Sequence, residues 1–176
     1  MQKLLSRSCK PIQSATWFCS LMLFLLIGCE KDDICVDGDT PLLVIRFFDS
    51  AQPETPKAVD QLRVIGVGNG DPVPTFADRS SLDSIALPLR PGETEITFIL
   101  IRDSQDEEGV ETGNPDTLQL NYITREEFVS RACGFIANYE ELESQLQTSS
   151  ENWIQSIEVD TTSVQNQDSR HVSIYH

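Results

Sequence analysis

Seven short apolar segments, each bounded by Gly, Pro, Asp or Asn, constrain this chain more than any other feature. They are rich in Val, Ile, Leu, Thr and aromatic residues, and they cover residues 41–49, 61–68, 83–89, 94–103, 116–124, 153–159 and 171–176. In the fifth segment, Leu118, Leu120 and Tyr122 alternate with polar residues, as in a strand with one buried face. Seven to nine such strands predict an all-β domain, a β-sandwich of immunoglobulin-like or transthyretin-like type.

Residues 124–147 are the hardest stretch to assign. Thr124 with Glu127 three positions later fits a helix capping box, and residues 140–147 favour a short helix. The large apolar residues around Gly134 suit instead a strand with a bulge. We predict a strand over residues 127–138, with the helix as the alternative.

The N-terminal 28 residues have the layout of a secretory signal. Three basic residues precede a mostly apolar run from Trp17 to Gly28, which is too short to cross about 30 Å of hydrocarbon. The sequence LIGC at residues 26–29 resembles the lipobox of bacterial lipoproteins, which implies that Cys29 is lipidated and becomes the new N-terminus. The expected organisation is therefore a lipoprotein signal peptide (1–28), a lipidated tether (29–40) and a β-sandwich domain (41–176). An ordinary cleaved signal that contains Cys29 is the alternative.

The charged residues directly after Cys29 indicate where in the cell the protein is anchored. Lys31, Asp32 and Asp33 resemble the surface-export signal of Bacteroidota lipoproteins, which implies a lipid anchor in the outer membrane and display on the cell surface. A hydrated tether at the periplasmic face of that membrane is the alternative.

A second short motif resembles the O-glycosylation signal of the same phylum, an Asp followed by Ser or Thr and a small or aliphatic residue. Four positions match it, with candidate acceptors at Ser50, Ser84, Thr117 and Thr161. An Asp-Ser pair that caps a turn is the simpler explanation at each of them.

The charge balance restricts the partners. Cleavage after residue 28 would remove three of the 13 basic residues and leave 10 basic against 28 acidic residues, a net charge of −18. A field of that sign repels phosphates, so we expect no nucleic-acid partner. The expected partners are the membrane, through the N-terminal lipid, and an envelope protein or glycan.

Two of the five cysteines remain once the others are assigned. Cys9 and Cys19 would leave with the signal, and lipid would block Cys29. In an oxidising envelope the remaining pair, Cys35 and Cys133, predicts one disulfide. The alternative is that the two thiols lie too far apart and stay reduced.

The sequence predicts no catalytic residue, and one loop is a candidate metal site. Asp103, Asp106, Glu108 and Asp116 lie in the acidic loop between two predicted strands, and carboxylate oxygens are ligands that Ca²⁺ takes. The spacing does not fit an EF-hand, and a solvated loop is the alternative. No other cofactor is indicated.

Two further features are assigned simple structural roles. His171 and His176 have no metal-binding spacing, and we expect them to be surface side chains. Residues 66–72 imitate a phosphate-binding glycine loop, but Pro72 and Pro74 block the helix that such a loop requires, so a turn is expected.

Several segments together carry a family resemblance. The sequences CEKDDICVDGDTPLLVIRFFD, LRVIGVG, DSIALPL, FVSRACGF and NWI resemble an uncharacterised family of Bacteroidota lipoproteins, known mainly from flavobacteria as a domain of unknown function. The resemblance implies a small anchored envelope protein with Cys35 and Cys133 as family features and no assigned activity. Two functions are therefore open: a noncatalytic binding or structural module, or a Ca²⁺-dependent binder or hydrolase that uses the loop at 103–116.

Overall fold

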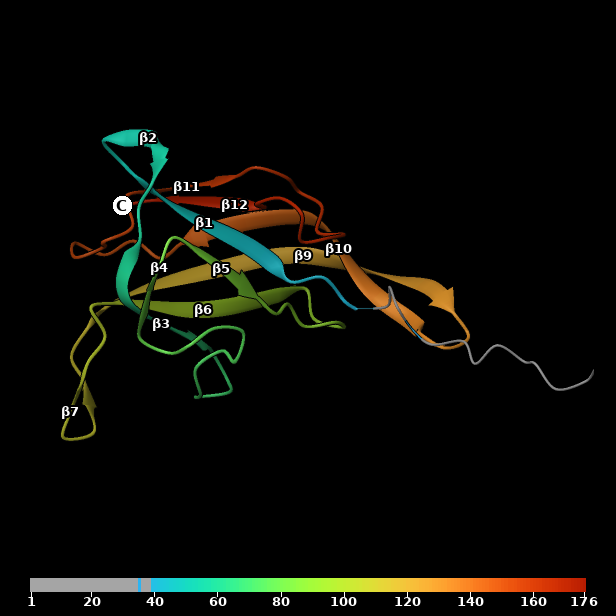
Figure 1. Cartoon of the computed structure of the whole chain (residues 1–176), viewed down its shortest axis with the longest axis horizontal. Coiled ribbons are helices and arrows are strands. Elements are labelled where there is room, and N and C mark those ends of the chain that lie inside the picture. The colour runs from blue at the N-terminus through green and yellow to red at the C-terminus, as the bar shows by residue number, and fades with distance from the viewer. Residues whose placement is uncertain (1–34, 36–38) are drawn as a thin grey trace, which may run out of the picture. The chain divides into compact units, whose positions relative to one another are not determined.

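The computed structural model describes residue 35 and residues 39–176, and the part of the chain from Cys35 to His176 forms one compact unit (Figure 1). Within these residues all regular structure is β-strand, which confirms the prediction of an all-β fold. No helix in the described part is long and apolar enough to cross a membrane. Cys29, Lys31, Asp32 and Asp33, the residues proposed for lipidation and export, lie outside the described residues.

The described chain contains more strands than the seven to nine that were predicted. In order they are β1 (Leu43–Asp49), β2 (Gln52–Pro56), β3 (Val59–Gly66), β4 (Ser80–Leu82), β5 (Ser84–Leu87), β6 (Glu95–Arg102), β7 (Asp106–Glu107), β8 (Val110–Glu111), β9 (Asn114–Ser130), β10 (Gly134–Leu146), β11 (Ser156–Val159) and β12 (Val172–Tyr175). All seven apolar segments became strands. The additional strands are short or exposed: all five residues of β2 are exposed, so no apolar alternation marks it.

The strands form two main sheets and a separate small hairpin (Figure 1). One sheet has the order β11-β12-β1-β2, with β5 also paired to β1, and the other has the order β10-β9-β6-β3-β4. The hairpin joins β7 to β8. Pairing is antiparallel throughout except between β1 and β12, which run parallel with Ile45 opposite Val172. The C-terminal strand therefore completes the first sheet beside the first strand.

The core lies between the two sheets and follows from alternation along the strands. On β6, Ile96, Phe98 and Leu100 are buried, whereas Thr97 and Ile99 between them are only half-buried. The first sheet contributes buried residues at alternate positions of β1 in the same way. Burying each such side chain contributes about 1.5–3 kcal/mol, so the packed faces stabilise a β-sandwich.

Residues 124–147, for which both a helix and a strand were considered, belong to a long antiparallel hairpin. β9 and β10 pair from Leu118 opposite Leu146 to Ser130 opposite Gly134, and residues 131–133 form the turn. The predicted strand at 127–138 is therefore two strands around this turn, and the helix considered for residues 140–147 is wrong. Gly134 has a φ of 72°, and the pairing register shifts between Gly134 and Phe135, so the bulge expected around this glycine lies directly after the turn. Pairing along β9 overrides the helix preference of the Glu-rich segment.

Candidate functional site

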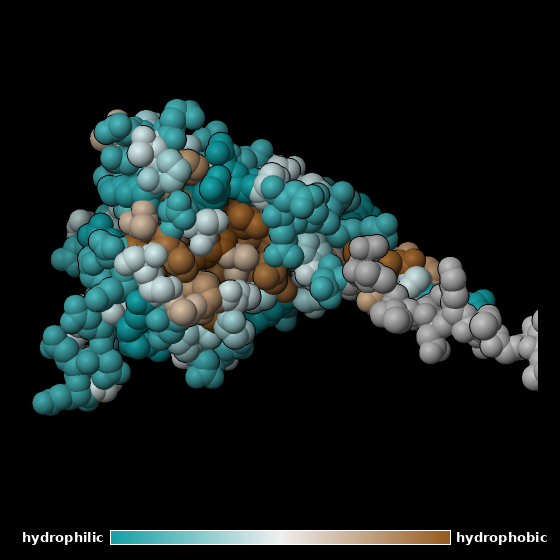
Figure 2. Space-filling view, viewed as in Figure 1, coloured by the Kyte–Doolittle hydropathy of each residue, from teal (hydrophilic) through white to brown (hydrophobic). Residues whose placement is uncertain are grey.

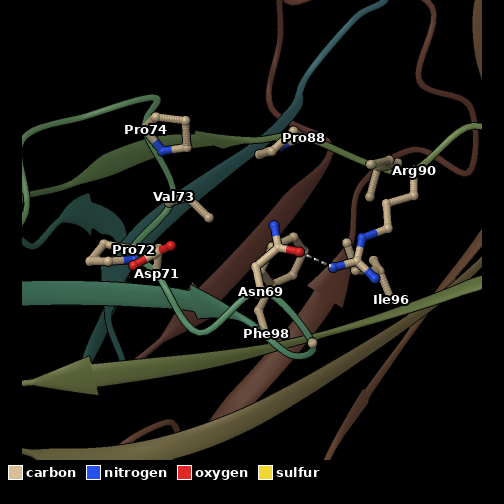
Figure 3. A pocket seen from close by; sticks show the side chains of 12 residues that line it. Asn69, Asp71, Pro72, Val73, Pro74, Pro88, Arg90, Ile96 and Phe98 are labelled. Atoms are coloured by element: carbon tan, nitrogen blue, oxygen red, sulfur yellow. Dashed lines mark hydrogen bonds between the residues drawn. The ribbon is translucent and has the colours of Figure 1, made fainter.

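A groove of about 660 Å³ opens at one side of the sandwich and is the best candidate for a functional site (Figure 3). Residues from β3, from the loop that follows it, from the segment after β5 and from β6 line it. They are Gly66, Gly68, Asn69, Asp71, Pro72, Val73, Pro74, Pro88, Leu89, Arg90, Ile96 and Phe98. Apolar side chains also gather near the middle of the face of the molecule shown in Figure 2.

The loop after β3 forms one wall of the groove. Residues 67–69 make a turn, and Gly68 and Gly70 have φ values of 97° and 81°, which L side chains rarely adopt. The N–H of Val73 then donates to the carbonyl of Val64 at 2.9 Å, which folds the loop back beside β3. The turn predicted over residues 66–72 is confirmed.

Arg90 closes one end of the groove. Its guanidinium donates to the carbonyl of Val67 at 3.1 Å and to Oδ1 of Asn69 at 3.2 Å, the contact drawn as a dashed line in Figure 3. Asp71 and Pro72 lie at the other side of Asn69. The groove thus carries a cation and a carboxylate at separate positions over a floor that includes Ile96 and Phe98.

Two tyrosines from the second sheet hold the opposite wall. Tyr139 donates its hydroxyl to the carbonyl of Leu89 at 3.2 Å. The Tyr122 hydroxyl accepts the N–H of Arg90 at 3.1 Å and donates to the carbonyl of Arg90 at 3.2 Å. The two rings meet edge to face with their centroids 5.2 Å apart. Residues 89 and 90 are therefore fixed by buried hydrogen bonds, so Arg90 begins from a rigid backbone.

Burial shifts the ionisation of both tyrosines. Burial, reinforced by the charge of the other phenol, raises the pKa of Tyr139 to about 12. Burial also raises the pKa of Tyr122, although the hydrogen bond from Arg90 opposes the shift. Both hydroxyls therefore stay protonated as donors across the physiological range.

The chemistry that the groove offers is recognition. Among the described residues that line it, Asp71 and Arg90 are the only titratable side chains, and none of the others is a His, Cys, Ser or Thr. Backbone groups, one amide, one guanidinium and one carboxylate can orient a ligand over an apolar floor, as in many binding sites.

The groove residues carried little signal in the sequence. Arg90 lies between Pro88 and Pro91, which marks an extended, rigid segment but says nothing of what it faces. The sequence indicated Tyr122 and Tyr139 only as residues of strands and gave no sign that their hydroxyls hold a groove wall. Only the glycines at 66, 68 and 70 indicated a loop of unusual backbone, and its partner segment lies some twenty residues away in the chain.

The acidic loop does not form the metal site that was considered for it. The described residues contain no group of three or more side chains placed to hold a metal ion. Asp103 pairs with Arg102 at 3.2 Å, and Asp106 accepts the N–H of Gly109 at 2.8 Å within the β7–β8 hairpin. Glu108 lies in the turn of that hairpin with a φ of 56°.

Asp116, the fourth residue proposed for the metal, has a structural role. Its carboxylate is buried and accepts hydrogen bonds from the Asn152 amide and the Ile154 backbone N–H, both at 2.8 Å. It therefore fastens the segment before β11 to the start of β9. The four carboxylates are separated because they lie on different elements: Asp103 and Glu108 in two turns, Asp106 on β7 and Asp116 on β9.

Another carboxylate of the loop, Glu111, pairs with arginine side chains. Glu111 lies 3.3 Å from the Arg79 guanidinium and accepts the Ser104 hydroxyl at 2.9 Å. Burial alone would raise the pKa of Glu111, but the Gly113 N–H, the Ser104 hydroxyl and Arg79 together lower it. This carboxylate is thus neutralised by the protein itself.

The expectation that the two histidines are surface side chains is wrong. His171 and His176 are only 2% and 5% exposed. Nδ1 of His171 accepts the N–H of Val44 at 2.9 Å, and the His176 ring packs edge to face against Phe47 and Trp153. Burial lowers the pKa of both rings. The C-terminal strand enters the core beside β1, which the sequence spacing of the two residues did not reveal.

The predicted disulfide is present. Cys35 and Cys133 are joined with their Cα atoms 4.9 Å apart, so Cys35 is fastened to the turn of the β9–β10 hairpin. It is a structural bond between segments 98 residues apart in sequence and lies outside the groove lining.

The four candidate glycosylation positions differ in setting. Ser50 lies in the turn between β1 and β2, and Thr161 lies in the loop after β11. Ser84 and Thr117 lie inside strands β5 and β9, where the Ser84 hydroxyl donates to the carbonyl of Ile45 at 3.4 Å. All four side chains are half-buried. The modification stays a prediction at each position.

Comparison with known proteins gives a family and no activity. A model described as "Family of unknown function (DUF6452)" matches residues 61–176, which include most of the second sheet, the groove and both histidines. No curated protein and no solved structure matches the chain. The match covers well over half of the chain, so the protein belongs to this family of unknown function.

Proposed function

We propose that the mature protein is a lipid-anchored, noncatalytic binding module of the bacterial cell envelope, and that the groove beside Arg90 is its binding surface. The observation that carries the proposal is the construction of that groove. Two buried tyrosine hydroxyls hold the backbone of one wall, and the polar side chains of Asn69 and Arg90 lie beside an apolar floor. A rigid site of this kind binds without a large ordering cost.

The groove favours an uncharged or weakly charged ligand. The Arg90 guanidinium already donates to Val67 and Asn69, so part of its hydrogen-bonding capacity is used internally. The protein's net charge of −15 also repels polyanions. An envelope protein loop or a glycan, each with apolar faces and hydroxyl or amide groups, matches these features.

The anchor and the location are supported by the sequence. The lipobox resemblance at residues 26–29 makes Cys29 the lipidated residue, and Lys31, Asp32 and Asp33 act as the export signal to the cell surface. The resemblance to Bacteroidota lipoproteins favours the outer membrane. If the export signal is inactive, the protein stays lipid-anchored at the periplasmic face.

Protease shaving of intact cells tests the location. Native protein is compared with a triple variant, Lys31→Ala, Asp32→Ala and Asp33→Ala, and lysed cells provide the control for protease access. We expect digestion of only the native form on intact cells. Protection of both forms until lysis would contradict surface display and direct the search for a partner to the periplasm.

Site-specific photocrosslinking in cells tests the groove. A photoreactive amino acid at Asn69 is compared with the same residue at Glu143, an exposed position on β10 outside the groove lining. We expect a discrete adduct from position 69, reduced when Arg90→Ala is added. Identical adducts from positions 69 and 143 would show that the groove is not the binding surface.

A further inference from the structure

The far half of the β9–β10 hairpin extends beyond the two packed sheets (Figure 1, orange). Residues 125–128 are exposed, as are Arg131, Ala132 and Phe135 at the turn and just after it. Antiparallel pairing nevertheless continues from the body of the domain to Ser130 opposite Gly134. The hairpin end is therefore an ordered structure with little of the domain packed against it.

Two aromatic residues lie side by side at this end. Phe128 and Phe135 are cross-strand partners, their ring centroids are 5.3 Å apart, and their side chains are 56% and 68% exposed. At alternate positions along β10, Ala137 and Tyr139 follow Phe135 and are buried. The aromatic pair thus continues the inner face of the hairpin past the point where the core ends.

The charge pattern changes sharply near the same place. Of the nine residues from Phe128 to Ile136, only Arg131 is charged, in a chain that is otherwise strongly acidic. Acidic residues begin again at Glu127, which accepts the Asn138 amide at 2.7 Å. Farther from the turn, Glu140 pairs with Arg125 at 2.9 Å. The hairpin therefore has an apolar end with one cation, above a polar stem.

The disulfide limits the distance between the end of the β9–β10 hairpin and Cys29. Cys133 in the turn is bonded to Cys35, which lies six positions after Cys29. A fully extended chain spans at most about 3.3–3.6 Å per residue, so this tether reaches about 20 Å at most. A lipid on Cys29 would hold the hairpin turn within that distance of the bilayer.

We infer that the end of the β9–β10 hairpin inserts Phe128 and Phe135 into the headgroup region of the bilayer that carries the protein's own lipid. This inference rests on the proposed lipid anchor at Cys29. Exposed phenylalanine rings are stabilised when they leave water for the boundary between headgroups and acyl chains, as the apolar faces of membrane-surface segments are. Arg131 is a local cation for the lipid phosphates, in a stretch that has none of the acidic residues that repel phosphates elsewhere in the chain, and the charged stem stays in water. The contact would orient the domain with the hairpin toward the membrane.

Tryptophan placed at the hairpin end tests the contact. The mature lipidated protein, which begins at Cys29, is reconstituted in vesicles of phosphatidylethanolamine and phosphatidylglycerol, with or without brominated acyl chains. Phe128→Trp is compared with Val110→Trp, which is 62% exposed in the separate β7–β8 hairpin. The unsubstituted protein gives the emission of the buried Trp153 as a baseline. The mass of the N-terminal peptide from each preparation reports the lipid.

We expect a blue shift and quenching by brominated lipid for Phe128→Trp, and neither for Val110→Trp. With the lipid attached, an unquenched Phe128→Trp would overturn the hairpin contact and leave the anchor intact, as would equal quenching at both positions. Emission that shifts without quenching would indicate a protein partner or a second copy at this face and would also overturn the contact. If the N-terminal peptide carries no lipid, the proposed anchor fails, and the inference fails with it.

Discussion

The hydroxyl of Tyr139 donates to the carbonyl of Leu89 at 3.2 Å, which links the long hairpin of one sheet to the segment that leaves the other. The groove wall depends on this bond and on the neighbouring bonds of Tyr122. These contacts between the two tyrosines and residues 89 and 90 together position Arg90, the residue that closes the candidate binding surface.

Replacing Tyr139 by Phe should weaken the fold. The Leu89 carbonyl would lose its buried donor, so we expect the free energy of unfolding to fall by about 1–2 kcal/mol, measured by urea denaturation. Tyr175→Phe is the matched control, because the Tyr175 hydroxyl bonds the exposed Glu158 carboxylate. Equal losses for the two variants would show that the bond to Leu89 contributes nothing specific.

The same tyrosine predicts how stability changes in alkaline solution. The pKa of Tyr139 rises from 10 in the unfolded chain to about 12 in the folded one. Its contribution is therefore complete below pH 10 and is lost as pH rises from 10 through about 12, because the unfolded chain releases its proton first. Denaturation at a series of pH values, with tyrosinate absorbance as a second readout, checks this. A stability curve that stays flat above pH 10 would contradict it.

The two buried histidines predict how stability changes in acidic solution. Burial lowers the pKa of His171 and of His176 from the unfolded value of 6.5. Stability is therefore fully present above pH 6.5 and falls as pH decreases below it, because only the unfolded chain takes up protons there. The protein has two histidines, so their NMR titrations can be assigned with single variants. Midpoints at or above 6.5 would be inconsistent with burial of the neutral rings.

Gly113 predicts a packing defect. A Cβ at this position would lie 2.6 Å from Cγ2 of Ile101 and 2.8 Å from both the Arg102 carbonyl oxygen and the Ser104 Cα. We expect Gly113→Ala to cost about 1–3 kcal/mol, since backbone atoms cannot move aside cheaply. The control is Gly66→Ala, where the nearest atom is a Phe98 ring carbon at 3.7 Å. A Gly113→Ala variant as stable as Gly66→Ala would refute the close approach.

Removing the disulfide should destabilise the mature domain. Cys35→Ser with Cys133→Ser releases a loop of 98 residues, and loop-closure entropy predicts a loss of about 2–5 kcal/mol. The measurement is urea denaturation of both proteins under oxidising conditions. Thiol labelling of the unreduced native protein gives an independent check, because ready labelling of Cys35 and Cys133 would mean that no bond had formed.

The alternation of apolar and polar residues made the strands of the core predictable. Strands without this alternation could not be predicted from the sequence. Strand β9 is indicated by the buried residues Leu118, Leu120 and Tyr122 at alternate positions. Strand β2 is exposed along its whole length and has no such pattern. The segment around residues 140–146 misled the prediction, because local propensity favours a helix there while eleven paired positions between β9 and β10 favour a strand.

The sequence by itself determined the class of fold and one long-range bond. Both follow from local chemistry, because the period of side chains along a strand is readable residue by residue, and two cysteines expected to remain after export can pair only with each other. The lipid anchor, too, is a prediction that rests on sequence alone.

Only the tertiary structure decided which of these residues meet. In the folded protein, carboxylates of the acidic loop pair with arginines and backbone N–H groups. Both histidines are buried beside β1, and Arg90 contacts the loop after β3. Such contacts depend on the order and register of strands distant in the chain, and many arrangements satisfy the same local pattern. The groove exists because this strand order brings its residues together, whereas the exposed aromatic pair is set by the register of the single β9–β10 hairpin.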